Sequence, residues 1–167
     1  MSRRILVVVL IMFAMTFASV IVSAKPDFNG SWLLNKDRSI GIQPGMEMNI
    51  TIKRDGDKLE VVTKIKTAQG ERVINDIFVL DEKEMDFTPQ QPNSKGKRTA
   101  KWLPRGNGIM VTDHITTETD KGTVKSQVVR KWVISPDGKE LITDMYIDDQ
   151  RGELVPIRRV FAKNTLN

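Results

Sequence analysis

The chain has 167 residues, 26 basic against 21 acidic side chains, a net charge of +5 and no cysteine. Without cysteine it has no disulfide, no thiol nucleophile, no thiolate metal ligand and no lipid-modified cysteine. A globular chain of this composition must therefore be held together by its apolar core.

The first 24 residues have the layout of a secretory signal peptide. Arg3 and Arg4 form a short basic head, residues 5–24 carry no charge, and the small residues Val22-Ser23-Ala24 precede Lys25. We expect cleavage after Ala24, and an uncleaved membrane anchor is the alternative, because the apolar run approaches the roughly 20 residues that a spanning helix needs. Either outcome predicts a periplasmic or secreted location, and cleavage leaves no membrane-spanning segment.

The remaining residues, 25–167, are predicted to form one domain. The length of 143 residues is typical of a single core, and the excess of basic residues falls to three once Arg3 and Arg4 are removed. Acids and bases are interspersed, with no basic stripe carrying aromatic side chains. Nucleic acid is therefore not an expected partner, and the sequence does not indicate an oligomeric state.

The predicted domain opens on a short strand that begins near Phe28 and includes Trp32. Residues 36–45 are rich in turn formers and too interrupted for a sizeable helix. From Met46 onwards apolar and polar side chains alternate up to Lys53, and the same period-2 pattern returns from Leu59. Such alternation predicts strands with one buried and one solvated face.

Further strands are expected along the rest of the chain, each ended by a turn rich in Gly, Pro, Asp or Asn: residues 71–80, 85–88, 98–103, 108–117, 123–134, 140–147 and 154–161. No stretch has a helical period over a useful length. Consecutive strands joined by short turns predict an all-β fold, a single antiparallel up-and-down β-barrel of about 8 to 10 strands. A barrel of this size is either filled by side chains or holds one small ligand.

The opening motif Phe28-x-Gly30-x-Trp32 at the head of this meander resembles the calycin group, which comprises lipocalins and fatty-acid-binding proteins. The longer run through Asn35 and Ser39 is similar to the start of small exported bacterial proteins of the lipocalin-like kind. In the lipocalin pattern the tryptophan lies at the closed end of the barrel, with a late arginine packed over its ring. The resemblance implies that Phe28, Gly30 and Trp32 are structural residues and that Arg158, or its neighbour Arg159, covers the tryptophan.

Fatty-acid-binding proteins add two features, which this sequence matches incompletely. Their last strand carries an inward Arg-x-Tyr pair that holds a ligand carboxylate, and the matching positions are Arg159 and Phe161, so the tyrosine hydroxyl is missing. Their two lid helices follow the first strand, where residues 36–45 are too few to form them. The resemblance therefore implies a barrel without a lid.

Two polar side chains invite a functional interpretation. His114 is the only histidine, and its same-face neighbours are Thr112 and Thr116. Adjacent Asp113 points to the opposite face, so His114 lacks an orienting acid and is more readily a surface residue than a base or haem ligand. Arg130 shares an apolar face with Trp132 and is either paired with an acid, such as Asp113, Asp144 or Asp76, or serves as an anion anchor.

The sequence thus predicts a binding protein for a small hydrophobic or amphipathic ligand. The expected ligand-binding residues are inward-facing apolar side chains and two arginines: Met48, Ile50, Val61, Ile65, Phe78, Met110, Val128, Arg130, Met145 and Arg159. A side-chain-filled barrel that acts as a structural or interaction protein of the cell envelope is the alternative. No nucleophile elbow, phosphate loop or histidine pair is present, so we expect neither an enzyme nor a metal or cofactor.

Overall fold

The alternating segments form ten antiparallel strands in the computed structural model, which describes residues 25–148 and 157–165 and has no helix in those ranges. The strands are β1 (Gly30–Asn35), β2 (Glu47–Asp55), β3 (Lys58–Thr67), β4 (Gly70–Val79), β5 (Met85–Phe87), β6 (Ser94–Trp102), β7 (Gly108–Thr119), β8 (Gly122–Ile134), β9 (Glu140–Asp148) and β10 (Ile157–Lys163).

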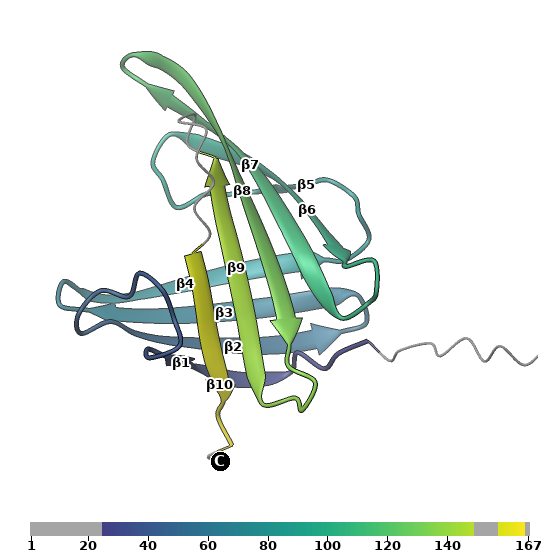
Figure 1. The fold of residues 1–167 in the computed structure, drawn as a ribbon. Helices are drawn as coiled ribbons and strands as arrows, with labels where there is room; N and C mark the ends of the chain where they lie inside the picture. Colours follow the sequence, from purple (N-terminus) through teal and green to yellow (C-terminus); the bar gives the residue numbers. More distant parts are fainter. Residues whose placement is uncertain (1–24, 149–156, 166–167) are drawn as a thin grey trace, which may run out of the picture.

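All ten strands belong to one sheet, in the order β4-β3-β2-β1-β10-β9-β8-β7-β6-β5. Neighbouring strands follow one another along the chain except at the centre, where β1 pairs with β10 and Trp32 lies opposite Lys163. The sheet curls over, so that β1–β4 form one layer and β7–β10 cross it as a second layer (Figure 1). The predicted all-β, up-and-down architecture is confirmed.

The hydrogen-bonded ladder does not close between its two ends, β4 and β5, within the described residues. β5 has only three residues and pairs with β6 alone. The turn before it takes the chain away from β4, with Glu82 at a positive φ of 63° and its N–H donating to the Ala100 carbonyl of β6 (3.1 Å). Side chains, rather than a strand ladder, therefore join β4 to the opposite layer.

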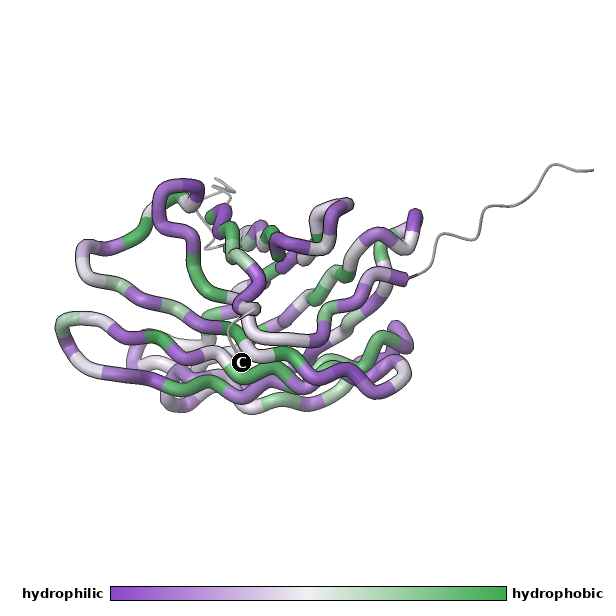
Figure 2. The backbone as a smooth tube through the Cα atoms, turned by 90° about the horizontal axis from the view of Figure 1, so that it is seen from below, coloured by the Kyte–Doolittle hydropathy of each residue, from purple (hydrophilic) through white to green (hydrophobic). Residues whose placement is uncertain are grey.

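The core lies between the two layers. Apolar and polar residues alternate along the strands in Figure 2. The buried apolar side chains form one cluster in the interior. Trp32, Phe28 and Ile109 are fully buried at the end of the fold where the opening segment enters, and the Phe28 ring lies 6.3 Å from that of Trp102. Burial of such large side chains stabilises a fold by about 1.5–3 kcal/mol each.

The link between β1 and β2 runs beside β10 and contains no helix, as expected. The Ile40 N–H donates to the Arg158 carbonyl (2.9 Å), and the Ser39 hydroxyl accepts from the Val160 N–H (3.0 Å). Ile42 then packs against the core. A short connecting segment thus occupies the position at which fatty-acid-binding proteins have their two lid helices.

One boundary differs clearly from the predicted one. β6 begins at Ser94, four residues before the expected start, because the Ser94 and Thr117 hydroxyls are hydrogen-bonded (2.8 Å) and Gly96 leaves room for the Phe87 ring. Residues 154–156 of the last predicted strand and the leader, 1–24, lie outside the described residues. In the part that is described, no helix of membrane-spanning length and hydrophobicity occurs.

Candidate functional site

A pocket of about 120 Å³ lies between the two layers. The inward faces of β2, β3 and β4 provide one wall, with Met48, Ile50, Thr63, Ile65 and Ile74. Strands β8, β9 and β10 provide the other, with Arg130, Trp132, Thr143, Asp144, Met145, Ile157, Arg159 and Phe161. The Asp144 carboxylate accepts from Arg158 on the outer face. The pocket is thus mainly apolar and contains two guanidinium groups.

Arg159 reaches the pocket from β10, and its guanidinium has no counter-ion among the described residues. Its Nη1 lies 3.6 Å from the Met48 Sδ, a weak acceptor, and its Nε is buried with no hydrogen-bond partner. No carboxylate within residues 25–148 and 157–165 forms an ion pair with it. Desolvation by burial lowers the pKa of Arg159, although a guanidinium remains charged at any physiological pH.

A buried ion cluster forms the neighbouring part of the interior. Asp113 on β7 accepts two hydrogen bonds from Arg98 on β6, from Nε (2.6 Å) and Nη2 (3.0 Å), and a third from the Arg130 Nη2. Asp76 on β4 accepts from the Arg98 Nη1 (2.7 Å) and lies 3.7 Å from the Arg130 Nη1. Arg98 and Asp113 are only 3% and 4% exposed, so their charges depend on one another.

The two arginines of this cluster have different surroundings. Desolvation lowers the pKa of Arg98, but its hydrogen bond to Asp113 and the charge of Asp76 outweigh that effect, and the pKa is raised overall. Desolvation lowers the pKa of Arg130 further than its partners raise it, and the charge of Arg98 lowers it as well. The buried Nε of Arg130 also lacks a hydrogen-bond partner. Arg130 is therefore the less fully satisfied arginine, and it is the one that lines the pocket.

The charges in the interior do not balance. Arg98 and Arg130 are matched by Asp76 and Asp113, whereas Arg159 has no acidic partner in the part of the chain that the structure describes. The pocket consequently has one uncompensated positive charge within an apolar lining. This arrangement suits an anion attached to an apolar group.

Six of the ten predicted ligand-binding residues meet at the pocket: Met48, Ile50, Ile65, Arg130, Met145 and Arg159. Val61 and Phe78 are buried in the core instead, where Phe78 packs edge-on against Trp132 with ring centroids 5.5 Å apart. Val128 occupies an inward position of β8 next to Arg130 but is not part of the lining.

The expectation that Met110 faces inward was wrong. Its neighbours Ile109 and Val111 are fully buried, so the alternation of β7 turns Met110 to the outer face. There it lines a surface hollow of about 370 Å³ with Val129, Lys131 and Tyr146.

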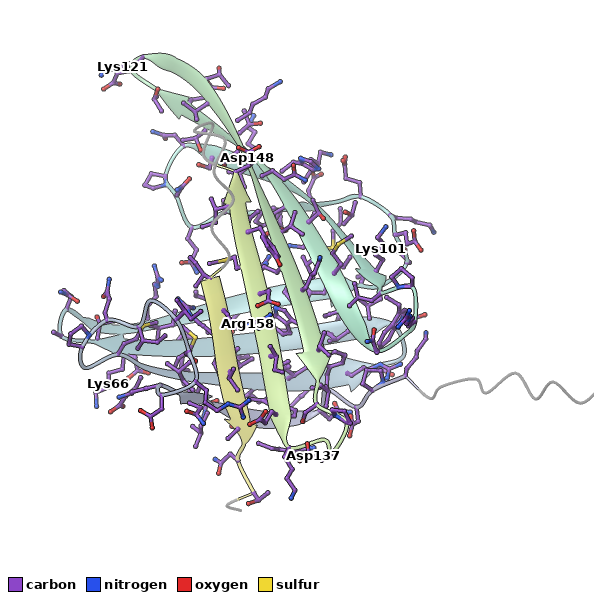
Figure 3. The ribbon with its side chains drawn as sticks, viewed as in Figure 1. Lys66, Lys101, Lys121, Asp137, Asp148 and Arg158 are labelled. Carbon is purple, nitrogen blue, oxygen red and sulfur yellow. The ribbon has the colours of Figure 1, made fainter. Side chains whose placement is uncertain are left out.

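The opening motif is structural, as the resemblance implied, but Arg158 does not cover Trp32. The Trp32 Nε1–H donates to the Phe28 carbonyl (3.0 Å), and Gly30 has a φ of 128° that a side chain would strain. Arg158 points outward and forms a two-pronged ion pair with Asp144 at 2.7 and 2.9 Å, on the face shown in Figure 3. Lys163, the ladder partner of Trp32, supplies the cation instead, with its Nζ 5.3 Å from the ring centroid.

His114 is exposed on the outer face while Asp113 points inward, which agrees with the alternation. In residues 25–148 and 157–165 no three His, Asp or Glu side chains gather into a metal site. The sequence analysis did not identify Arg98 as part of the ion cluster. Like Arg130, it is an arginine at an inward position of a strand, and this could have indicated a buried ion pair. The sequence analysis also missed Thr63, Ile74, Thr143 and Ile157 in the pocket lining.

The ten-stranded fold matches the calycin-type barrel of fatty-acid-binding proteins. The REP1-NXSQ fatty acid transporter is similar with a TM-score of 0.56 and 16% identity, over 83% of this chain and 97% of that one. Lipid binding protein 8 of Caenorhabditis elegans is similar with a TM-score of 0.54 and 13% identity, over 82% of this chain and 95% of that one. A Schistosoma mansoni fatty acid binding protein in complex with arachidonic acid is similar with a TM-score of 0.52 and 15% identity, over 83% of this chain and 96% of that one. No protein-family model and no curated protein sequence matches the chain.

Proposed function

We propose that this chain is an exported, non-enzymatic binding protein for a small anionic amphipathic molecule, held between the two layers of the sheet. The observation that carries the proposal is the uncompensated guanidinium of Arg159 inside an apolar pocket. A partly buried cation without a counter-ion among the described residues destabilises a fold, so a ligand that supplies the missing anion would explain its presence. The structural neighbours named for fatty acid transport and lipid binding support a ligand of this class.

The size of the pocket bears on the kind of ligand. At about 120 Å³ it is smaller than the 300–1,000 Å³ that is typical of small-molecule sites, so it takes a headgroup and a short apolar segment. Beyond it, the inward positions of β8 and β9 continue with Val128, Ile147 and Val124, and Val124 is 42% exposed. The apolar tail of a longer ligand would lie along these side chains, toward the projecting β7–β8 hairpin whose tip carries Lys121 (Figure 3).

The missing tyrosine of the Arg-x-Tyr pair has a local substitute. Phe161 replaces it and is fully packed, but Thr143 is the ladder partner of Arg159 on β9 and lines the same pocket. In this proposal the Thr143 hydroxyl donates to the bound anion beside the guanidinium.

The proposed location rests on the leader. Residues 1–24 would direct export and be removed, so the binding protein would act in the periplasm or outside the cell. N-terminal sequencing of the protein recovered from the extracytoplasmic fraction tests this part, with Lys25 as the expected first residue. An intact Met1 in that fraction would contradict cleavage.

The binding proposal is tested by titrating the purified protein with dansylaminoundecanoic acid and displacing the probe with decanoate or decanol. We expect decanoate to compete more strongly than decanol, and the Arg159→Met variant to lose about ten-fold or more of its affinity for decanoate while decanol is unaffected. Arg158→Met is the matched control, because its guanidinium is one residue away and faces outward. Equal loss in both variants, or no displacement in the wild type, would contradict the proposal.

A side-chain-filled barrel that acts through its surface is the second candidate. The bulk of Trp132, Phe78 and Phe161 inside the sheet, together with the small pocket, favours it. Native mass spectrometry separates the two: a bound mass released on denaturation supports the ligand-binding protein, and an empty protein that also fails to bind the probe supports the packed barrel.

A further inference from the structure

Strand β4 is the weakly attached end of the sheet. It pairs with β3 along its whole length, but its other edge has no ladder partner among the described residues (Figure 1). An unpaired edge of this kind is held only by what its side chains contact. The mobility of β4 therefore depends on a small number of contacts across the open edge.

Those contacts come mainly from two inward side chains, Asp76 and Phe78, and the Ile77 carbonyl also accepts a long hydrogen bond from the Arg98 Nη1 (3.5 Å). The Asp76 carboxylate accepts from the Arg98 Nη1 at 2.7 Å and approaches the Arg130 Nη1 at 3.7 Å. The Phe78 ring is fully buried, packs against Trp132 and has both guanidinium groups over its faces, at 5.0 and 5.2 Å. Phe78 is thus anchored in the core, whereas Asp76 is held by charge.

The half of β4 that precedes Asp76 is held more weakly, by the partly buried Ile74, which packs against the core. Glu71, Arg72 and Asn75 are exposed, and Val73 is 48% exposed although it is apolar. Ile74, one inward step before Asp76, lines the pocket. Movement of this half-strand away from the opposite layer would widen the pocket at Ile74.

We propose that Asp76 is a clasp that holds β4 against Arg98 and Arg130, and that an anion bound in the pocket displaces it from Arg130, so that ligand binding and release of the first half of β4 are coupled. This inference rests on the proposed anion-binding function. It adds a moving element and the residue that controls it.

The displacement follows from the unequal contacts of Asp76. Its bond to Arg98 is short, while the separation from Arg130 exceeds hydrogen-bonding distance. Arg130 also has an unpartnered Nε and lines the pocket, so it can engage a ligand anion, and the negative charge of that anion would repel the nearby Asp76 carboxylate. Because coupling between binding free energies is reciprocal, a variant that loosens the clasp must also bind the anion more tightly.

Hydrogen exchange followed by mass spectrometry tests the clasp without any ligand. The double variant Asp76→Asn/Arg98→Gln removes the ion pair and leaves Arg130 and Asp113 as a neutral pair, which avoids the folding defect expected of Asp76→Asn alone. We expect exchange to accelerate about ten-fold in peptides from β4 and to stay unchanged in β2. Asp144→Asn, which breaks the outer ion pair with Arg158, is the control and should leave hydrogen exchange in β4 unchanged. Unchanged exchange in β4 of the double variant would overturn the clasp.

The coupling is tested with dansylaminoundecanoic acid as the probe. In the wild type, saturation with the probe should raise exchange in β4 about two-fold or more while other strands become more protected. In the double variant the Kd for the probe should fall by about five-fold. Binding that depends on Arg159 but protects β4, or leaves its exchange unchanged, would overturn the coupling and leave the proposed function standing. A wild-type protein that binds no probe would overturn both, and the ligand-free exchange data would still decide whether Asp76 holds the strand.

Discussion

Replacing Arg159 with methionine is expected to stabilise the fold while removing its affinity for anions. The guanidinium is partly buried, its Nε has no partner, and its best contact is the Met48 sulfur at 3.6 Å. Methionine fills a similar volume beside Met48 and has no group that must be solvated. The variant therefore separates the energetic cost of the residue from its proposed use.

The sign of the effect follows from the pKa of Arg159, which burial lowers below the value in the unfolded chain. A base whose pKa is lowered on folding destabilises the fold wherever it is charged, and the penalty would be lost only as the pH rises through the folded-state pKa. The gain from Arg159→Met is thus constant between about pH 5 and pH 9. After allowing for the solvent that still reaches the side chain, we expect about 1 kcal/mol of stabilisation, or roughly 3 °C in Tm.

Urea unfolding followed by tryptophan fluorescence measures the gain, with probe binding measured on the same samples. Arg158→Met is the control and should slightly lower stability, because it removes the exposed pair with Asp144 and leaves the Arg159 guanidinium in place. A clear loss of stability in Arg159→Met would show that the guanidinium already has adequate partners, and the argument from an uncompensated charge would fail.

Three further variants test the interior. Asp113→Asn leaves Arg98 and Arg130 facing one acid, and should cost about 3–5 kcal/mol in urea unfolding; a cost below about 1 kcal/mol would mean that water reaches the cluster. Gly108→Ala should cost about 1–3 kcal/mol, since the new Cβ would lie 2.4 Å from the Trp132 carbonyl oxygen, and an unchanged Tm would refute that crowding. Lys163→Gln should lower stability by about 0.5–1 kcal/mol, because it removes the cation over the Trp32 ring. Unchanged stability would show that this contact does not stabilise the fold.

The strands were predictable because the physics that forms them is local. Alternation from Met46 to Lys53 places every second side chain on one face whatever the neighbouring strand is, and Gly-rich or Asp-rich turns mark where each run ends. The start of β6 was misplaced because Ser94 to Lys97 contain no apolar residue. That segment becomes a strand only because it pairs with β7, and no local sequence pattern indicates this pairing.

The site was predictable only in part, because it depends on register between distant strands. The apolar alternation of β10 identifies Arg159 as inward, but that Arg158 pairs with Asp144 follows from the β9–β10 register. Met110 was misassigned because β7 carries apolar residues on both faces near its start. The ion cluster joins β4, β6, β7 and β8, so its composition emerges only once the sheet has curled.

The open edge beside β4 and the pairing of β1 with β10 also determine where the chain can be reconnected. The Asn164 N–H donates to the Ser31 carbonyl (2.8 Å), so the first and last strands end side by side and a short linker can join them. New termini placed in the turn between Val79 and Met85 would interrupt no ladder, because β4 and β5 are already the two ends of the sheet. The resulting circular permutant would begin with β5 and finish with β4, so that strand order along the chain would equal strand order in space. Every strand would then pair with its immediate successor, which lowers the contact order and should make the permuted barrel fold faster than the natural one.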